Sequence, residues 1–412
     1  MSQSVDRDMT KVMNQKLSRR KFNKTLATTG ALGTVVSTAA GVGLYKHFSD
    51  ENVEKEIWFS AQGHNPKQYG IGWVSPANQK HGQALSNFRG HGLCQNPVNE
   101  EHVVMFARRP GNYGVRLNAE TGEVDGTFHC CDGRYMHGHG CFSADGKMLF
   151  STESSIRSGQ GKIVLRHSQT LEMIGEFESY GIGPHEVKLM PDGHTLVVAN
   201  GGLLTHPESG RKVLNLDTMR STLSYIDSRS GALISEHTVA ESKASIRHLD
   251  VAADGTVAMA LQVQRKAMNN NKPTALAAIH KQGKDIQILN APEKLTSKLH
   301  DYMGSVAINN RSRLAAFTSP KGDLVLFWHL DDLTLQGYHA FHDVCGLAVS
   351  QDNKYFVLSN SAGKIRQINA KTLEENIHKR MQFHNVSWDN HMLSITLASL
   401  KSVPLVASKS FG

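Results

Sequence analysis

The sequence predicts an all-β protein, a seven-bladed β-propeller of four-stranded blades preceded by an N-terminal export signal. Short segments of alternating apolar and polar residues recur along most of the chain and are separated by tight turns. Asp145, Asp192 and Asp254 each precede a Gly in such a turn, at intervals of 47 and 62 residues. This spacing is typical of propellers and solenoids. A β-solenoid and a two-sheet sandwich are the alternative folds.

One repeat unit is clearest at residues 181–193, Gly-Ile-Gly-Pro-His-Glu-Val-Lys-Leu-Met-Pro-Asp-Gly. Val187 and Leu189 alternate with Lys188, which is the period of a half-buried strand. Asp192-Gly193 follows as a turn, because Gly accepts a positive φ. Further strands come before and after each turn, so each repeat holds four strands, as in a propeller blade.

Seven segments share the start of this unit, which we call the mouth motif. They are residues 89–93, 137–142, 183–189, 245–251, 303–308, 343–349 and 383–388. The last motif has no outer strands after it, and residues 57–88 hold strands without a mouth motif. We therefore expect these two pieces to share one blade and close the ring, so that residues 57–412 form the propeller.

The N-terminal segment, residues 1–45, has the pattern of a twin-arginine export signal. Residues 18–24 read Ser-Arg-Arg-Lys-Phe-Asn-Lys, with the pair Arg19 and Arg20, and a weakly apolar run from Thr25 to Tyr45 follows. We expect export of the folded protein to the periplasm, with residues 46–56 as a linker. A basic patch before a transmembrane helix is the alternative, and an uncleaved signal would provide the only contact with the membrane.

Charge and cysteine content exclude other classes. Residues 1–40 carry +5 of the net charge of +8, so the remainder of the chain is near +3. This balance, and the absence of a nucleic-acid-binding motif, argue against a nucleic-acid partner. The five cysteines are odd in number and lack a C-x-x-C pair, so we expect core thiols rather than a disulfide framework.

The mouth motifs carry the candidate site. The residue just before the first apolar position of each motif would lie at one end of the central channel, where residues of different blades converge. This column holds His91, His139, Glu186, His248, Ser305, Gly346 and Asn385. Imidazole and carboxylate together suit a transition metal such as iron, copper or zinc, so we predict His91, His139, Glu186 and His248 as metal ligands. A polar channel lining solvated by water, without a metal, is the alternative.

Further residues near the mouth are candidates for binding a ligand or for orienting the metal ligands. Arg247, Arg108 and Arg109 suit an anion or carboxylate. A polar insert at residues 203–220 holds His206 and Arg211, and such loops often carry binding. The other candidates are His137, His185, His384 and Asn385. Residues 389–391, Asp-Asn-His, are interpreted as a hairpin turn.

The motifs Arg-Gly-His-Gly, Phe-Ala-Arg-Arg-Pro-Gly, Gly-Ile-Gly-Pro-His-Glu and Thr-His-Pro-Glu-Ser-Gly-Arg resemble a family of exported bacterial proteins of unknown function. The resemblance implies a YVTN/WD40-like seven-bladed propeller, export by the twin-arginine pathway, and genes that often lie beside those of imelysin-type iron-uptake proteins. It supplies no catalytic residues, and residues 136–139 depart from its pattern, which places His137 below His139 as a candidate.

Three functions follow as hypotheses. The first is a periplasmic propeller that holds a metal or metal complex at the channel mouth, linked to iron uptake and to an imelysin-type partner. The second is a metal-free platform for a periplasmic protein, and the third is a lactonase-like hydrolase. No G-x-S-x-G, P-loop, haem-attachment or dinucleotide motif indicates another enzyme class. For a metal site we expect affinity to fall between about pH 7 and pH 5, because unperturbed histidines titrate near 6.5.

Overall fold

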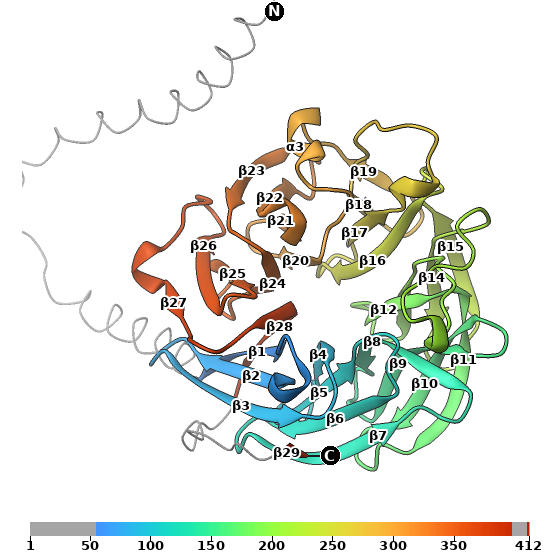
Figure 1. The fold of residues 1–412 in the computed structure, drawn as a ribbon, viewed down its shortest axis with the longest axis horizontal. Coiled ribbons are helices and arrows are strands. Elements are labelled where there is room, and N and C mark those ends of the chain that lie inside the picture. The colour runs from blue at the N-terminus through green and yellow to red at the C-terminus, as the bar shows by residue number, and fades with distance from the viewer. Residues whose placement is uncertain (1–54, 398–409, 412) are drawn as a thin grey trace, which may run out of the picture. The chain divides into compact units, whose positions relative to one another are not determined.

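A computed structural model describes residues 55–397 and 410–411, and the predicted signal with Arg19 and Arg20 lies outside these residues (Figure 1). Seven sheets surround a central channel, and six of them are four-stranded and antiparallel. The predicted all-β, seven-bladed propeller is therefore confirmed. Among the described residues, none of the helices is long and apolar enough to span a bilayer.

In each of the first six blades the four strands follow one another in chain order, and the first strand of the blade lines the channel (Figure 1). The first three blades consist of β4 (Gly90–Gln95), β5 (His102–Ala107), β6 (Tyr113–Asn118) and β7 (Glu123–His129); β8 (Arg134–Phe142), β9 (Met148–Ser155), β10 (Gln160–His167) and β11 (Met173–Ile182); and β12 (Pro184–Leu189), β13 (Thr195–Asn200), β14 (Thr222–Asp227) and β15 (Leu233–Thr238).

The next three blades consist of β16 (Ala244–Val251), β17 (Val257–Val263), β18 (Ala277–His280) and β19 (Gln287–Leu289); β20 (Ser305–Asn309), β21 (Leu314–Ser319), β22 (Leu324–His329) and β23 (Leu335–Ala340); and β24 (Val344–Val349), β25 (Tyr355–Asn360), β26 (Lys364–Asn369) and β27 (Met381–Gln382). Short helices interrupt the connections: α3 (Glu293–Ser297), η2 (Pro66–Gln68), η3 (Pro207–Ser209), η4 (Arg265–Ala267), η5 (Pro320–Gly322) and η6 (Ile377–Lys379).

The seventh blade joins the two ends of the described chain. Its strand order is β28 (Trp388–Thr396), β1 (Glu56–Gln62), β2 (Gly70–Ser75), β3 (Lys80–Ser86) and β29 (Ser410–Phe411), with β29 parallel to β3. In Figure 1 the red β28 lies beside the blue β1, and Trp58 pairs with Ser394. The C-terminal strand thus lines the channel while N-terminal strands complete its sheet, which leaves no open edge between first and last blades.

Alternation within the strands explains the core. Every residue of β13 is buried, and Val197 and Val198 point into two different apolar clusters because successive side chains face opposite sides of a sheet. The turns work as the sequence predicts. Gly193 has a φ of 74°, and the Asp192 carboxylate accepts hydrogen bonds from the backbone N–H groups of His194 and Thr195 at 2.9 Å each.

The insert at residues 203–220 folds back toward the mouth of the channel. The Tyr135 hydroxyl, from β8, donates to the Thr205 carbonyl at 2.9 Å. The Asn215 side chain accepts from the Leu204 N–H and donates to the Gly202 carbonyl, each at 2.8 Å. These contacts fix both ends of the segment that carries Arg211.

Candidate metal site in the central channel

The strands that line the channel are irregular where the candidate residues lie. Register shifts interrupt the pairing of β4, β8, β12, β16, β24 and β28 with their neighbours. A bulge leaves residues unpaired and re-aims their side chains. In β16, for example, the shift falls between Ile246 and His248, so Arg247 and His248 both reach the mouth region. β20 pairs without a shift and contributes Ser305.

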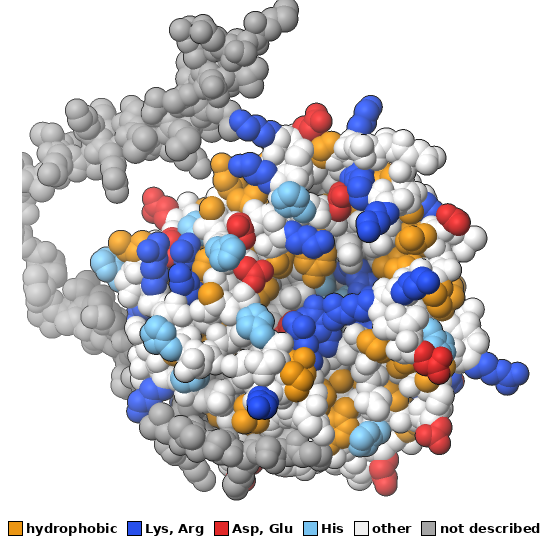
Figure 2. Space-filling model, viewed as in Figure 1, with side chains coloured by type: hydrophobic (Ala, Val, Ile, Leu, Met, Phe, Trp, Pro, Cys, Tyr) orange, Lys and Arg blue, Asp and Glu red, His pale blue; other side chains and the backbone are white. Residues whose placement is uncertain are grey.

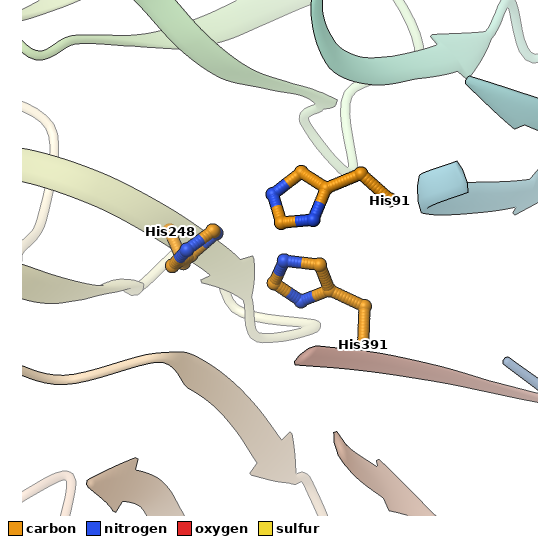
Figure 3. Close-up of side chains that lie close together, drawn as sticks. All are labelled: His91, His248 and His391. Carbon is orange, nitrogen blue, oxygen red and sulfur yellow. The ribbon is translucent and has the colours of Figure 1, made fainter. Parts of the chain in front are cut away.

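Five histidines from five different blades meet in the channel. Ring centroids are 4.4 Å apart for His248 and His391, 4.6 Å for His91 and His391, and 4.7 Å for His185 and His248. His139 lies 4.8 Å from His91. Figure 3 shows the rings of His91, His248 and His391 directed toward one another from separate strands. The topology therefore brings together residues that are up to 300 positions apart in sequence.

These histidines and Glu186 form three overlapping groups of possible metal ligands. Within each group the ligand atoms lie within 4.8 Å of one another: His91 with His248 and His391, His91 with His139 and His185, and His139 with Glu186 and His248. Ligand atoms around one zinc ion lie about 3.3 Å apart, given bonds of about 2.0–2.1 Å. Small side-chain rotations would bring any of the groups around an ion.

Neighbouring groups orient several of these side chains. The Glu186 carboxylate accepts from the Leu249 N–H at 3.1 Å and lies 3.2 Å from His248 Nδ1. The Ser305 Oγ donates to the Asn390 carbonyl at 2.6 Å and lies 2.8 Å from His391 Nδ1. Because that hydroxyl proton is committed to the carbonyl, His391 Nδ1 carries the proton and its Nε2 keeps a free lone pair.

Buried ring nitrogens without a hydrogen-bond partner are concentrated here. They are His91 Nδ1, His137 Nδ1, His139 Nε2, His185 Nδ1 and His391 Nε2. Such atoms are rare in folded proteins because leaving them unpaired is costly, and each calls for an explanation such as a bound ion or water. His137 differs from the others, since its Nε2 bonds to Ser154 Oγ at 2.8 Å and it belongs to none of the three groups.

The histidines stay neutral well below neutral pH. Burial, and then the positive charge of neighbouring His and Arg side chains, holds the pKa of all five well below the ordinary 6.5. A neutral imidazole is the form that binds metal, so protons compete weakly with an ion at this site. The expectation that affinity falls between about pH 7 and pH 5 rests on unperturbed histidines, and the burial shifts it to lower pH.

Arginine side chains surround the outer end of the histidine cluster. A pocket of about 40 Å³ is lined by Arg108, Arg109 and Arg211, by Tyr302 and Asn390, and by His91, His137, His185 and His248. Burial, and then the charge of Arg211, lowers the pKa of Arg109 to about 10. In Figure 2, Lys and Arg side chains gather at the centre of the face that is drawn.

Asp389 partly balances this positive charge. Its carboxylate contacts Arg89 Nη2 at 2.7 Å and Arg108 Nη1 at 2.7 Å, and the side chain is almost completely buried. Burial alone would raise the pKa of Asp389, but Arg108 and Arg89 hold it below its usual range. Deeper in the channel, Lys188 Nζ lies 3.7 Å from both Glu186 and Asp250.

Some predicted residues lie elsewhere. His384 and Asn385 are exposed in the segment before β28, and His206 is on the insert, where its Nδ1 accepts from the Glu208 N–H at 3.3 Å. The interpretation of residues 389–391 as a hairpin turn is wrong, because they lie inside β28. His391 occupies the channel position that the column assigned to Asn385. Met392 and Leu393 follow His391 as the first apolar residues, and this pattern could have identified His391 as the channel residue of its strand.

The fold and this site define the chain as a seven-bladed β-propeller with a histidine-lined channel. Residues 85–395 match a family described as "Protein of unknown function (DUF1513)", and the chain belongs to that family. A search of curated proteins gives no match. Among solved structures, hydrazine synthase of Kuenenia stuttgartiensis is similar, with a TM-score of 0.55 and 14% identity over 76% of this chain and 89% of that one. At this identity the likeness concerns the fold alone.

Proposed function

We propose that this protein is a binding protein that holds a transition metal, or a metal complex, among the histidines of its central channel. The observation that carries the proposal is the set of three overlapping ligand groups, built from side chains of five blades that are all buried except the half-buried His391. Five imidazoles and one carboxylate suit iron, copper or zinc better than magnesium or calcium, which prefer oxygen ligands.

The electrostatics of the site support the same proposal. The pKa values of the histidines are lowered, and Glu186 is the one acidic side chain in the three ligand groups. His139 Nδ1 lies 3.7 Å from Glu186 Oε1, and His248 lies against the other oxygen of the carboxylate. Unpartnered nitrogens of His91, His139 and His391 would gain bonds to an ion without losing existing hydrogen bonds.

Metal content tests the proposal directly. The protein purified from its exporting host is expected to contain about one metal equivalent by elemental analysis, or to bind one added equivalent of Zn²⁺, Cu²⁺ or Fe²⁺. The double change His139→Ala with His248→Ala should abolish binding, because each removes a ligand from two of the three groups and together they affect all three. The matched control, His206→Ala with His384→Ala, alters two histidines outside the cluster and should bind normally.

Other results would change the assignment. A wild-type protein that carries no metal and binds none stoichiometrically would overturn the proposal and favour a metal-free interaction platform. Turnover of a lactone substrate, abolished by the His139 and His248 changes, would instead favour the hydrolase.

We further propose that the protein acts in the periplasm after twin-arginine export and works with an imelysin-type iron-uptake partner. The support is the Arg19-Arg20 motif and the family resemblance of the sequence. Changing both arginines to Lys should retain the protein in the cytoplasm, as measured by cell fractionation. Co-purification with the imelysin-type protein at stoichiometric yield tests the partner, and two proteins that elute separately would contradict it.

A further inference from the structure

The arginines at the mouth carry an uncompensated positive charge. We name Arg108, Arg109, Arg211 and Arg247 the arginine rim. Asp389 is shared between Arg89 and Arg108. Across residues 55–397, no carboxylate lies within ion-pair distance of Arg109, Arg211 or Arg247. Three guanidinium groups therefore meet at one end of the channel without a protein anion to neutralise them.

Two of these groups are also short of hydrogen-bond partners. Arg247 is 7% exposed, and its Nη1 has no partner. The Nη1 of Arg109 is buried and unpartnered as well. Burial, and then repulsion by Arg109, pushes the pKa of Arg247 well below its usual value. Buried cations without partners are costly, and an anion that bridges them would relieve both the repulsion and the missing hydrogen bonds.

Three members of the arginine rim, Arg108, Arg109 and Arg211, line a pocket that limits the size of the group that enters. Its volume of about 40 Å³ is slightly larger than the roughly 30 Å³ that one water molecule takes in the liquid. A planar head group therefore fits, and the rest of a ligand must extend outward. Guanidinium forks match carboxylates in a planar, bidentate manner. The Tyr302 hydroxyl and the Asn390 amide line the same pocket and are 3.0 Å apart, which adds donors at its edge.

The anion pocket and the metal groups share side chains. His91, His185 and His248 line the pocket, and each also belongs to one or more of the groups of possible metal ligands. A carboxylate seated against the arginines would thus lie next to an ion among the histidines. One molecule with several carboxylates could contact both the arginines and the metal.

We propose that the arginine rim binds a small polycarboxylate, and that this anion is a ligand of the metal, so the protein takes up a metal–carboxylate chelate rather than a bare ion. The anion site stands on the arginines alone. The second clause rests on the proposed metal-binding function and extends it by naming the chemical class of the metal's ligand.

Calorimetric titration with citrate tests the anion site on the metal-free full-length protein. Wild type should bind one citrate, more weakly as salt is added. Arg109→Gln with Arg211→Gln should lower the affinity at least tenfold. The control Arg229→Gln with Arg311→Gln changes two exposed arginines in turns after β14 and β20, and its affinity should stay within about twofold of wild type.

Phosphate and a monocarboxylate, acetate, serve as competing probes. Citrate binding that is stronger than that of both probes supports a polycarboxylate site. Phosphate binding tighter than citrate, an unchanged affinity in the arginine double variant, or no saturable citrate binding would each overturn the anion site. Unchanged circular dichroism of the variants shows that folding does not cause the loss.

A second titration after loading with Zn²⁺ separates the two proposals. Citrate affinity should rise at least tenfold on loading, since the anion then also contacts the ion. Equal affinity with and without zinc would overturn the chelate clause and leave the anion site in place. A protein that binds citrate but never zinc removes the proposed metal function alone, and one that binds zinc but never citrate removes this inference alone.

Discussion

The two sides of the channel differ in the chemistry that their strands present. On one side, the neighbouring strands β28, β4, β8, β12 and β16 supply five histidines and Glu186. On the other, β20 supplies Ser305, and β24 supplies Cys345 and Gly346. The backbone of the repeats is alike, but a side chain at Gly346 would displace the Ser359 hydroxyl, since a Cβ there would lie 2.1 Å from Ser359 Oγ. The blades thus share one scaffold, and single positions at the bulges determine where the site lies.

The largest effect expected from this asymmetry is a pH dependence of stability. The unfolded chain takes up protons below pH 6.5, whereas the buried histidines with lowered pKa do not, so stability falls as pH decreases. Each such group contributes about 1.4 kcal/mol per pH unit below its unfolded pKa. Five groups predict a loss of several kcal/mol between pH 6.5 and 5.5, measured by urea unfolding of the metal-free protein.

One substitution inside the histidine cluster and one outside it test the origin of this pH dependence. His139→Gln should make the pH dependence shallower by one group, whereas His384→Gln, at an exposed position, should leave it unchanged. Identical slopes for wild type and His139→Gln would show that the channel histidines titrate normally in the folded protein.

A smaller effect is expected at Asp389, at the boundary between the two sides. Asp389→Asn would leave Arg89 and Arg108 without their carboxylate partner, and the two side chains are 37% and 16% exposed. Solvent screens the charges that remain, so the cost should be about 1–3 kcal/mol, below that of a fully buried ion pair. Because the folded pKa of Asp389 is depressed, this stabilisation is fully present at pH 7 and is lost as pH falls below about 4. Denaturant unfolding at pH 7 measures it, with the exposed Asp285→Asn as control.

The smallest effect concerns the ligand-poor side. Ser305→Ala removes the hydroxyl that holds the Nδ1 of His391, so metal affinity should fall about tenfold while the melting temperature changes little. Ser305→Thr retains the hydroxyl and should restore most of the affinity. Ser235→Ala, in an outer strand, is the matched control. Full affinity in Ser305→Ala would mean that His391 needs no support from the opposite side.

The propeller could be predicted because its signals are local. Alternation in units such as residues 181–193, and the Asp-Gly turns, are read directly from neighbouring residues, and the ring closure follows from the blade count. Four predicted ligands, from His91 to His248, also meet in the channel. The prediction of the seventh mouth motif at residues 383–388 is wrong. These residues have the sequence pattern of a mouth motif, but the strand that lines the channel, β28, begins only at Trp388. Bulges, which no sequence pattern marks, then decide that His185 joins the cluster beside Glu186.

The closing blade has a consequence for the order in which the protein becomes functional. His391 is supplied by β28, which pairs with β1 from the opposite end of the described chain. The other four histidines of the cluster are therefore synthesised before His391, and the seventh sheet must assemble before this side chain reaches them. A partly synthesised chain holds the earlier histidines in an incomplete ring. Under the proposed metal-binding function, the complete cluster would be loaded only after the seventh sheet has formed, so that the folded propeller, rather than a nascent chain, would select the ion.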